Sequence, residues 1–170
     1  MKLDWRGALG IVLSAALLAW VLSPLAPQPP SSGVVVTADE IATTLKQSIA
    51  NNVVDQPIQK ADLAGGHVAA VALLRRTKAE TSALIHDRVT EIYEITEGSG
   101  TIVTGGTLKD ATPTDLTRVN AGPSQTGTHL GGESRRVGPK DVIIIPAGVA
   151  HRFSALDGPI VYMVYRFQPK

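Results

Sequence analysis

Two stretches of the chain decide its fold: "HDRVTEIYEITEGSGTIVTGG", residues 86–106, and "GPKDVIIIPAGVAHRFSAL", residues 138–156. Both contain short apolar runs bounded by Gly, Pro or Asp, which is typical of β-strands separated by tight turns. Within the first stretch, "EGSG" at residues 97–100 lies between two such runs and predicts a hairpin. From residue 66 to the C-terminus there are about eight segments of this kind, with turn signals every ~8–12 residues, a pattern that predicts an all-β sandwich or barrel.

The composition limits the classes of function. The 170 residues, of which 44% are hydrophobic and 18% are charged, suit one folded domain with a tail. The net charge is +1 and the basic residues are scattered, so we expect no nucleic-acid partner. The chain contains no cysteine, which excludes disulfides, thiolate metal sites and cysteine nucleophiles.

The N-terminal residues predict a membrane segment. Residues 7–26 carry no charge and follow Lys2 and Arg6, and about 20 apolar residues are enough to cross a bilayer. The basic side of such a segment stays in the cytoplasm. We therefore predict a cytoplasmic N-terminus (residues 1–6), a single-pass anchor in a bacterial cytoplasmic membrane (7–26) and a C-terminal domain in the periplasm. The alternative is a cleaved signal peptide and a secreted periplasmic protein, but a proline follows each candidate cleavage position.

A Pro- and Ser-rich spacer is predicted at residues 27–36, and the folded part at residues 37–170. Thr37 and Glu40 have the spacing of a capping box at the start of a helix. Apolar residues then recur at helical spacing, at Ile41, Leu45 and Ile49. We expect a short amphipathic helix from residue 37 to about residue 51, lying against the sheet or beside the membrane.

Apolar residues of the strand-like segments are predicted to form the barrel core: Tyr93, Ile95, Ile143, Ile145, Phe153, Val161 and Met163. Residues 109–132 contain few apolar side chains. We predict that they form a long irregular insertion, of the kind used as a lid or a binding edge.

The two opening stretches resemble the two motifs of the cupins, which are small β-barrels of jelly-roll type. The first cupin motif has two histidines one residue apart, followed by a glutamate and then a glycine. His86, Glu91 and Gly98 match the second histidine, the glutamate and the glycine. Leu84 occupies the first histidine position, so the sequence departs from the motif there.

The second cupin motif has a proline, a glycine and a histidine, and Pro146, Gly148 and His151 match them. The resemblance covers about residues 66–168. It implies an all-β fold of the cupin jelly-roll type, as in a small single-domain bacterial cupin, preceded by the transmembrane helix, the spacer and the short amphipathic helix.

The resemblance also implies that His86, Glu91 and His151 point into the barrel and hold one divalent metal ion: Fe, Mn, Ni or Zn. Two imidazoles and one carboxylate are the ligand set of facial-triad sites, which leave coordination positions open. Leu84 removes a fourth ligand and is expected to weaken metal binding.

A reading without metal stays open for the same residues. His86 then makes a polar contact at the barrel rim, His151 caps its turn, and Glu91 pairs with Arg88 or Arg152. His129, in the predicted insertion, is expected to be exposed to solvent.

Two functions follow from these observations. In the first, which the sequence favours, the chain is a membrane-anchored periplasmic cupin domain without turnover. It acts as an accessory or scaffolding subunit of a membrane protein complex, or as a small-ligand-binding module. Its partners are then the membrane and an integral membrane protein or a second copy in a homodimer, and no catalytic residue is assigned. In the second, the chain is a metal-dependent cupin enzyme, an oxygenase or isomerase acting on a small organic substrate.

Overall fold

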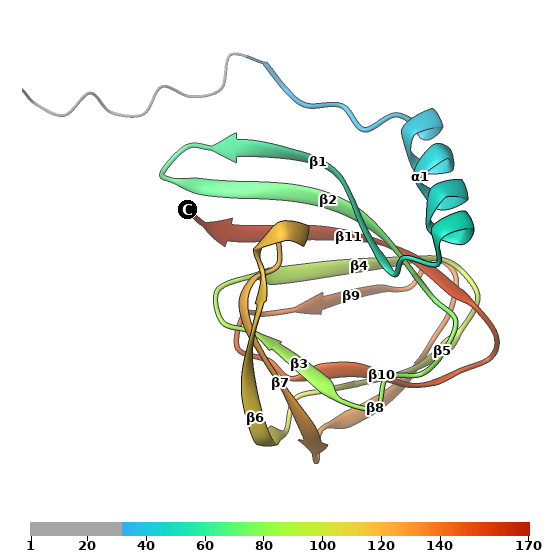
Figure 1. Ribbon diagram of the computed structural model, residues 1–170, viewed down its shortest axis with the longest axis vertical. Coiled ribbons are helices and arrows are strands. Elements are labelled where there is room, and N and C mark those ends of the chain that lie inside the picture. Colours follow the sequence, from blue (N-terminus) through green and yellow to red (C-terminus); the bar gives the residue numbers. More distant parts are fainter. Residues whose placement is uncertain (1–31) are drawn as a thin grey trace, which may run out of the picture.

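Residues 32–170 are described by a computed structural model and form one α-helix and eleven strands (Figure 1). Helix α1 spans Ala38–Asn51, and a short 3-10 turn, η1, spans Thr117–Val119. The strands are β1 (Asp55–Leu63), β2 (His67–Arg76), β3 (Ala83–His86), β4 (Thr90–Glu97), β5 (Gly100–Thr104), β6 (Thr107–Leu116), β7 (Gly122–Leu130), β8 (Glu133–Val137), β9 (Val142–Ile145), β10 (His151–Leu156) and β11 (Ile160–Pro169).

The strands form two antiparallel sheets that face each other. One sheet has the order β1-β2-β11-β4-β9 and the other has the order β6-β7-β3-β10-β5-β8. Strands that follow one another in the sequence mostly lie in opposite sheets, so the chain winds back and forth between them as in a jelly roll (Figure 1). The mostly-β prediction is confirmed, and the arrangement is consistent with the jelly-roll fold that the motifs imply.

An apolar core lies between the two sheets. Among the predicted core residues, Tyr93, Ile95, Ile145 and Phe153 belong to this inner cluster, and Ile143 packs against it. Val161 and Met163 are buried as well, but on the outer face of their sheet, because successive residues of β11 point to opposite sides.

The predicted capping box is present at the start of helix α1. The helix covers the outer face of the sheet. The backbone N–H of Glu40 donates to Oγ1 of Thr37 at 3.2 Å, and the N–H of Thr37 donates to Oε2 of Glu40 at 2.8 Å. Ile41 and Leu45 pack against the cluster that contains Val161 on the sheet. The helix therefore lies against the sheet, which was one of the two expected positions, and Figure 1 shows it standing outside β1 and β2.

The predicted hairpin around "EGSG" is wrong, although the turn itself is present. Strand β4 pairs with β9 and β11, whereas β5 pairs with β8 and β10, so the turn carries the chain from one sheet to the other. Gly98 has φ +75°, and a Cβ there would lie 2.1 Å from the carbonyl oxygen of Pro159. Only glycine fits this crossing.

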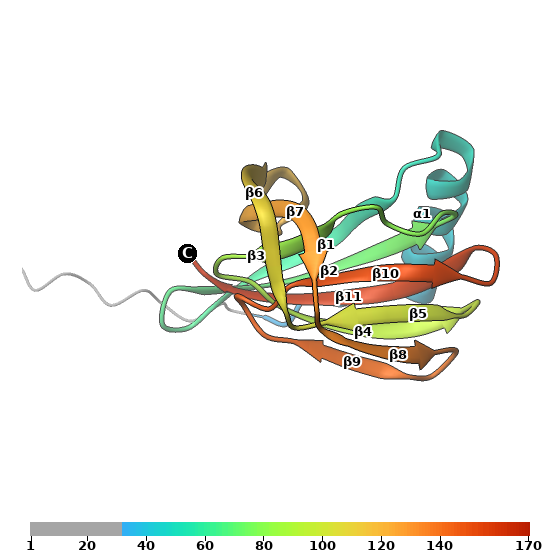
Figure 2. The same cartoon turned by 90° about the horizontal axis from the view of Figure 1, so that it is seen from below.

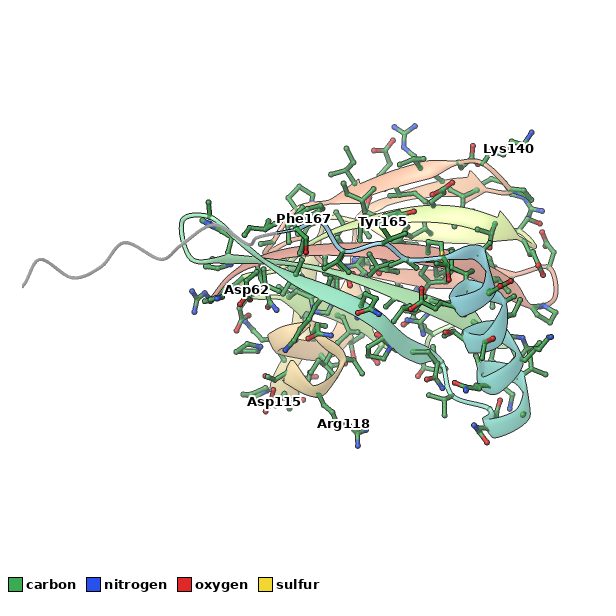
Figure 3. The ribbon with its side chains drawn as sticks, turned by 90° about the horizontal axis from the view of Figure 1, so that it is seen from above. Asp62, Asp115, Arg118, Lys140, Tyr165 and Phe167 are labelled. Carbon is green, nitrogen blue, oxygen red and sulfur yellow. The ribbon has the colours of Figure 1, made fainter. Side chains whose placement is uncertain are left out.

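The predicted irregular insertion at residues 109–132 is also wrong, because most of it is the β6–β7 hairpin. Its strands are rich in threonine, a good strand former, but β6 is largely exposed, β7 is mostly half-buried, and no apolar alternation marks either strand. The hairpin runs at a steep angle to the other strands (Figure 2). Asp115 and Arg118 project near its tip (Figure 3).

Between residues 32 and 170, no helix is long and apolar enough to cross a bilayer. The predicted cytoplasmic N-terminus and anchor (residues 1–6 and 7–26), and most of the spacer, lie outside the described residues. Those parts of the domain prediction stay predictions.

Candidate metal centre

His86 and Glu91 come from facing sheets. His86 is the last residue of β3 in the six-stranded sheet, and Glu91 is the second residue of β4 in the five-stranded sheet. The chain crosses between the sheets over residues 87–89, and Val89, only 1% exposed, anchors this crossing. The five-residue spacing of the motif therefore places an imidazole and a carboxylate on opposite inner walls of the barrel.

His151 is the first residue of β10 and reaches the same place through the turn before it. In that turn the N–H of Val149 donates to the carbonyl of Pro146 at 3.2 Å, and the N–H of Gly148 donates to the carbonyl of His86 at 2.9 Å. The second bond fastens the turn of the second motif to the end of β3. The two histidine rings consequently lie with their centroids 5.3 Å apart.

The three predicted ligands form one buried cluster. His86, Glu91 and His151 are 4%, 1% and 5% exposed, and one ligand atom of each lies within 4.8 Å of the other two. The two Nε2 atoms lie 3.3 and 3.4 Å from the same oxygen, Oε2 of Glu91. Ligand atoms that are each about 2.1 Å from a metal ion, at a tetrahedral angle, lie about 3.4 Å from one another. The observed spacing is therefore that of neighbouring ligands around one small cation.

The outer hydrogen bonds fix which nitrogen of each ring carries the proton. Nδ1 of His151 lies 3.0 Å from the carbonyl oxygen of Val149, which can only accept, so this nitrogen is protonated. Nδ1 of His86 lies 2.8 Å from Oγ of Ser124, and the single hydrogen of that hydroxyl is shared between the carbonyl oxygens of Ala121 and Gly122, each 3.2 Å away. The hydroxyl therefore accepts from Nδ1 of His86. In the neutral rings, both Nε2 lone pairs are directed at the Glu91 carboxylate, as metal coordination requires.

Two donors hold the Glu91 carboxylate. The Tyr93 hydroxyl donates to Oε2 at 2.7 Å, and Nε of Arg166 donates to Oε1 at 2.8 Å. Burial works against the ionised form. While no cation is bound, hydrogen bonds that protonated His151 and His86 rings donate to the carboxylate, and the charges of His86 and Arg166, outweigh burial, so the pKa of Glu91 lies well below its usual range. Burial, and then the neighbouring carboxylate, raise the pKa of Tyr93 well above its usual range. Tyr93 therefore stays protonated and Glu91 stays ionised.

Arg166 is one of the site residues that the sequence did not predict. It is 2% exposed and lies on β11, directly opposite Glu91 in the sheet register. Its other nitrogens donate to both carboxylate oxygens of Asp55, at 3.3 and 2.6 Å, and to the carbonyl of Val119. Burial opposes the charge of Arg166, but Asp55 and Glu91 raise its pKa above the usual value.

The predicted partners of Glu91 in the reading without metal are therefore wrong. Arg88 donates to the backbone carbonyl of Lys170, and Arg152 donates to the carbonyl of Glu80. His129 lies in β7, where Nε2 is 2.7 Å from the carbonyl oxygen of Gly105, so it is partly buried and takes no part in the cluster.

Leu84 occupies the place of a fourth ligand, as the motif implies. It is the direct partner of His151 in the β3–β10 register, and paired residues in an antiparallel sheet point to the same face. The described donors around the site are thus two imidazoles and one carboxylate. This donor set, its spacing and its ring tautomers fit one divalent cation.

Comparison with known proteins gives distant likenesses only. No family model and no curated protein sequence matches the chain. Solved structures to which the chain is similar include the protein BH2720 of Bacillus halodurans, with 18% identity, a TM-score of 0.48 and coverage of 84% of this chain and 86% of that one. A cupin protein from Bacteroides fragilis has 18% identity, a TM-score of 0.37 and coverage of 65% and 75%. A salicylate 1,2-dioxygenase from Pseudoaminobacter salicylatoxidans has 11% identity, a TM-score of 0.45 and coverage of 79% of this chain and 34% of the dioxygenase.

Proposed function

We propose that the chain is a metal-dependent enzyme of the cupin type, in which His86, Glu91 and His151 hold one divalent cation. The observation that carries this proposal is the convergence of the Nε2 atoms of His86 and His151 on Oε2 of Glu91, at 3.3 and 3.4 Å. Without a proton or a cation between them, three electron-rich atoms at this spacing repel one another in a buried site. A divalent ion removes that repulsion and is neutralised in part by Glu91.

Metal analysis of the protein purified without chelator tests this centre. We expect close to one Fe, Mn, Ni or Zn per chain, and loss of that metal in His151→Ala. His129→Ala is the matched control, because it removes an imidazole that lies outside the cluster. A wild-type protein that holds none of these metals as purified, and that binds none of them in calorimetric titration, contradicts the proposal.

The reaction class fits an oxygenase or an isomerase acting on a small organic substrate. A divalent ion with open positions polarises a substrate oxygen or, when it is iron, binds dioxygen. The surrounding protein residues hold the Glu91 carboxylate in position and shield the centre. Tyr93 keeps its proton and holds Oε2 in place, Arg166 restrains the other carboxylate oxygen, and the buried walls exclude water. Fe(II), Mn(II), Ni(II) and Zn(II) all accept two imidazoles and one carboxylate.

The membrane-anchored accessory role stays a prediction, because its support lies in residues 1–31. The periplasmic location and the partners, whether a membrane protein or a second copy, stay predictions for the same reason. Detergent extraction followed by native mass measurement tests them. A monomer that leaves the membrane with salt alone contradicts the anchor.

A further inference from the structure

The barrel is open on one flank, between two strands that follow each other in the sequence. Strands β8 and β9 are edge strands of opposite sheets and make no ladder with each other. The turn that joins them is closed by bonds between Gly138 and Asp141, with N–H donors 2.8 and 3.0 Å from their acceptors. Lys140 points outward from this turn (Figure 3), and from there the two strands diverge into the two sheets (Figure 1).

A groove of about 380 Å³ lies in this opening. Its inner wall includes Ile102 and Thr104 from β5, Val137 from β8 and Ile143 from β9. Ile102, Val137 and Ile143 belong to the apolar core or pack against it. The volume is within the range of pockets that hold small organic molecules, about 300–1,000 Å³.

The sheet registers place the groove beside the metal centre. Thr104 is the direct partner of His151 in the β5–β10 ladder, and Ile143 is the direct partner of Tyr93 in the β4–β9 ladder. Side chains of directly paired residues lie on the same face, with Cβ atoms about 4.5–5.5 Å apart. His151 and Tyr93 do not line the groove themselves, but each is the strand neighbour of a residue that does, so the groove lies one side chain away from the metal centre on both walls.

Arg135 supplies a positive charge on the wall of this groove. It pairs directly with Ile102 in the β5–β8 ladder and so faces the interior side of the sheet. Its partner is Glu133 at 2.7 Å, and the two side chains are 70% and 67% exposed. Such an exposed pair contributes about 0–1 kcal/mol, so the guanidinium is free to exchange partners. Arg136 also borders the groove, but its guanidinium binds Asp157 and Ser99.

A second groove, under the β6–β7 hairpin, is a weaker candidate for access to the metal. It is bordered by Ser124, whose hydroxyl accepts from Nδ1 of His86. A molecule in this groove would reach the Nδ1 side of the His86 ring, whereas the ligand nitrogen Nε2 is on the other side of the ring.

We propose that the groove between β8 and β9 binds a small organic carboxylate, with its apolar body against Ile102 and Ile143 and its carboxylate on Arg135. The inference rests on the metal centre proposed above, because the molecule so held presents its inner end to the flank of that centre. A carboxylate is favoured because Arg135 presents a planar, bidentate donor that matches it. The apolar wall favours a hydrocarbon or aromatic body over a sugar.

Co²⁺ serves as the probe metal, and the full-length protein is used. Calorimetry with Co²⁺ alone tests the metal centre by itself. The visible spectrum of the Co²⁺-loaded protein is then titrated with acetate, butyrate and benzoate. We expect all three to perturb the Co²⁺ bands, with the Kd decreasing from acetate to benzoate because a longer body reaches the isoleucines.

Arg135→Gln is expected to weaken benzoate binding about tenfold and to leave Co²⁺ affinity unchanged. The control Arg118→Gln, which removes an arginine of η1 that does not line the groove, changes neither. Ile143→Ala should remove the preference for benzoate over acetate, and Thr104→Trp should fill the groove and abolish benzoate binding. Equal benzoate binding in the two arginine variants overturns the proposal, as does a Co²⁺-loaded protein that none of the carboxylates perturbs.

Failure of the metal centre is distinguishable from failure of the groove. If calorimetry finds no Co²⁺ binding, benzoate is added to metal-free protein with isotope-labelled isoleucine methyl groups. Shifts of the Ile102 and Ile143 signals, without a shift of Ile58 on the outer face, support the groove on its own. Unchanged signals overturn it.

Discussion

Nε of Arg166 lies 2.8 Å from Oε1 of Glu91, and this bond fastens the candidate ligand carboxylate to the neighbouring strand β11. The same guanidinium binds Asp55, which lies in the first strand after α1. The buried guanidinium of Arg166 thus lies between two carboxylates that come from distant parts of the chain. Oε2 of Glu91 is left to face the two histidines, so the geometry favours coordination through one oxygen.

Removing the Arg166 charge is expected to destabilise the fold strongly. Arg166→Met leaves two carboxylates without their buried partner, and breaking a buried pair in this way costs about 3–5 kcal/mol. Urea unfolding of the variant and the wild type measures the difference. Arg136→Met is the matched control, because it breaks an exposed pair with Asp157, for which less than about 1 kcal/mol is expected. Equal losses in the two variants would contradict the role given to Arg166.

The sequence predicted the three candidate ligands but not the residues that hold them. His86, Glu91 and His151 stand at the spacing of two sequence motifs, and the turns within those motifs bring them together. Arg166 has no such local signal, since its partners Glu91 and Asp55 are 75 and 111 residues away. In the sequence, Arg166 is marked only as a charged residue within an apolar strand.

The strands, too, were predicted only where local sequence marks them. Strands buried on one face were recognised because apolar residues mark them, but the β6–β7 hairpin was not, because β6 is largely exposed and β7 carries few apolar side chains. The turn at Gly98 was predicted correctly from local residues. Which sheet each flanking strand joins depends instead on pairing with β10 and β11, which lie far along the chain, as in the pairs His151–Thr104 and Val161–Glu97.

The bond between His86 and Ser124 is expected to govern metal affinity. Ser124→Ala removes the acceptor that fixes the proton on Nδ1, and the loss of such an outer partner typically lowers metal affinity about 10–100-fold. Calorimetric titration with Zn²⁺ measures this change. Ser154→Ala, which removes a hydroxyl bonded to the carbonyl of Thr101, should leave the affinity unchanged. An unchanged affinity in Ser124→Ala would show that the ring is positioned without this bond.

The capping box at the start of α1 is expected to contribute to the stability of the folded domain. Thr37→Ala removes the side-chain acceptor for the N–H of Glu40, and the loss of such a cap costs about 1 kcal/mol. The free energy of unfolding in urea measures the effect. Thr43→Ala, in the same helix but away from the cap, is the control. A loss of the same size in both would assign the effect to the helix interior.

Leu84 is the position at which metal affinity should increase. It faces the interior beside His151, so Leu84→His adds an imidazole on the wall that already carries two ligands. A direct ligand should matter at least as much as an outer partner, so we expect the affinity for Zn²⁺ or Co²⁺ to rise about 10–100-fold. Ile85→His is the control, because the next residue of a strand points to the opposite face and cannot reach the cluster. A rise in Ile85→His, or none in Leu84→His, would mean that the cation is held elsewhere than between β3, β4 and β10.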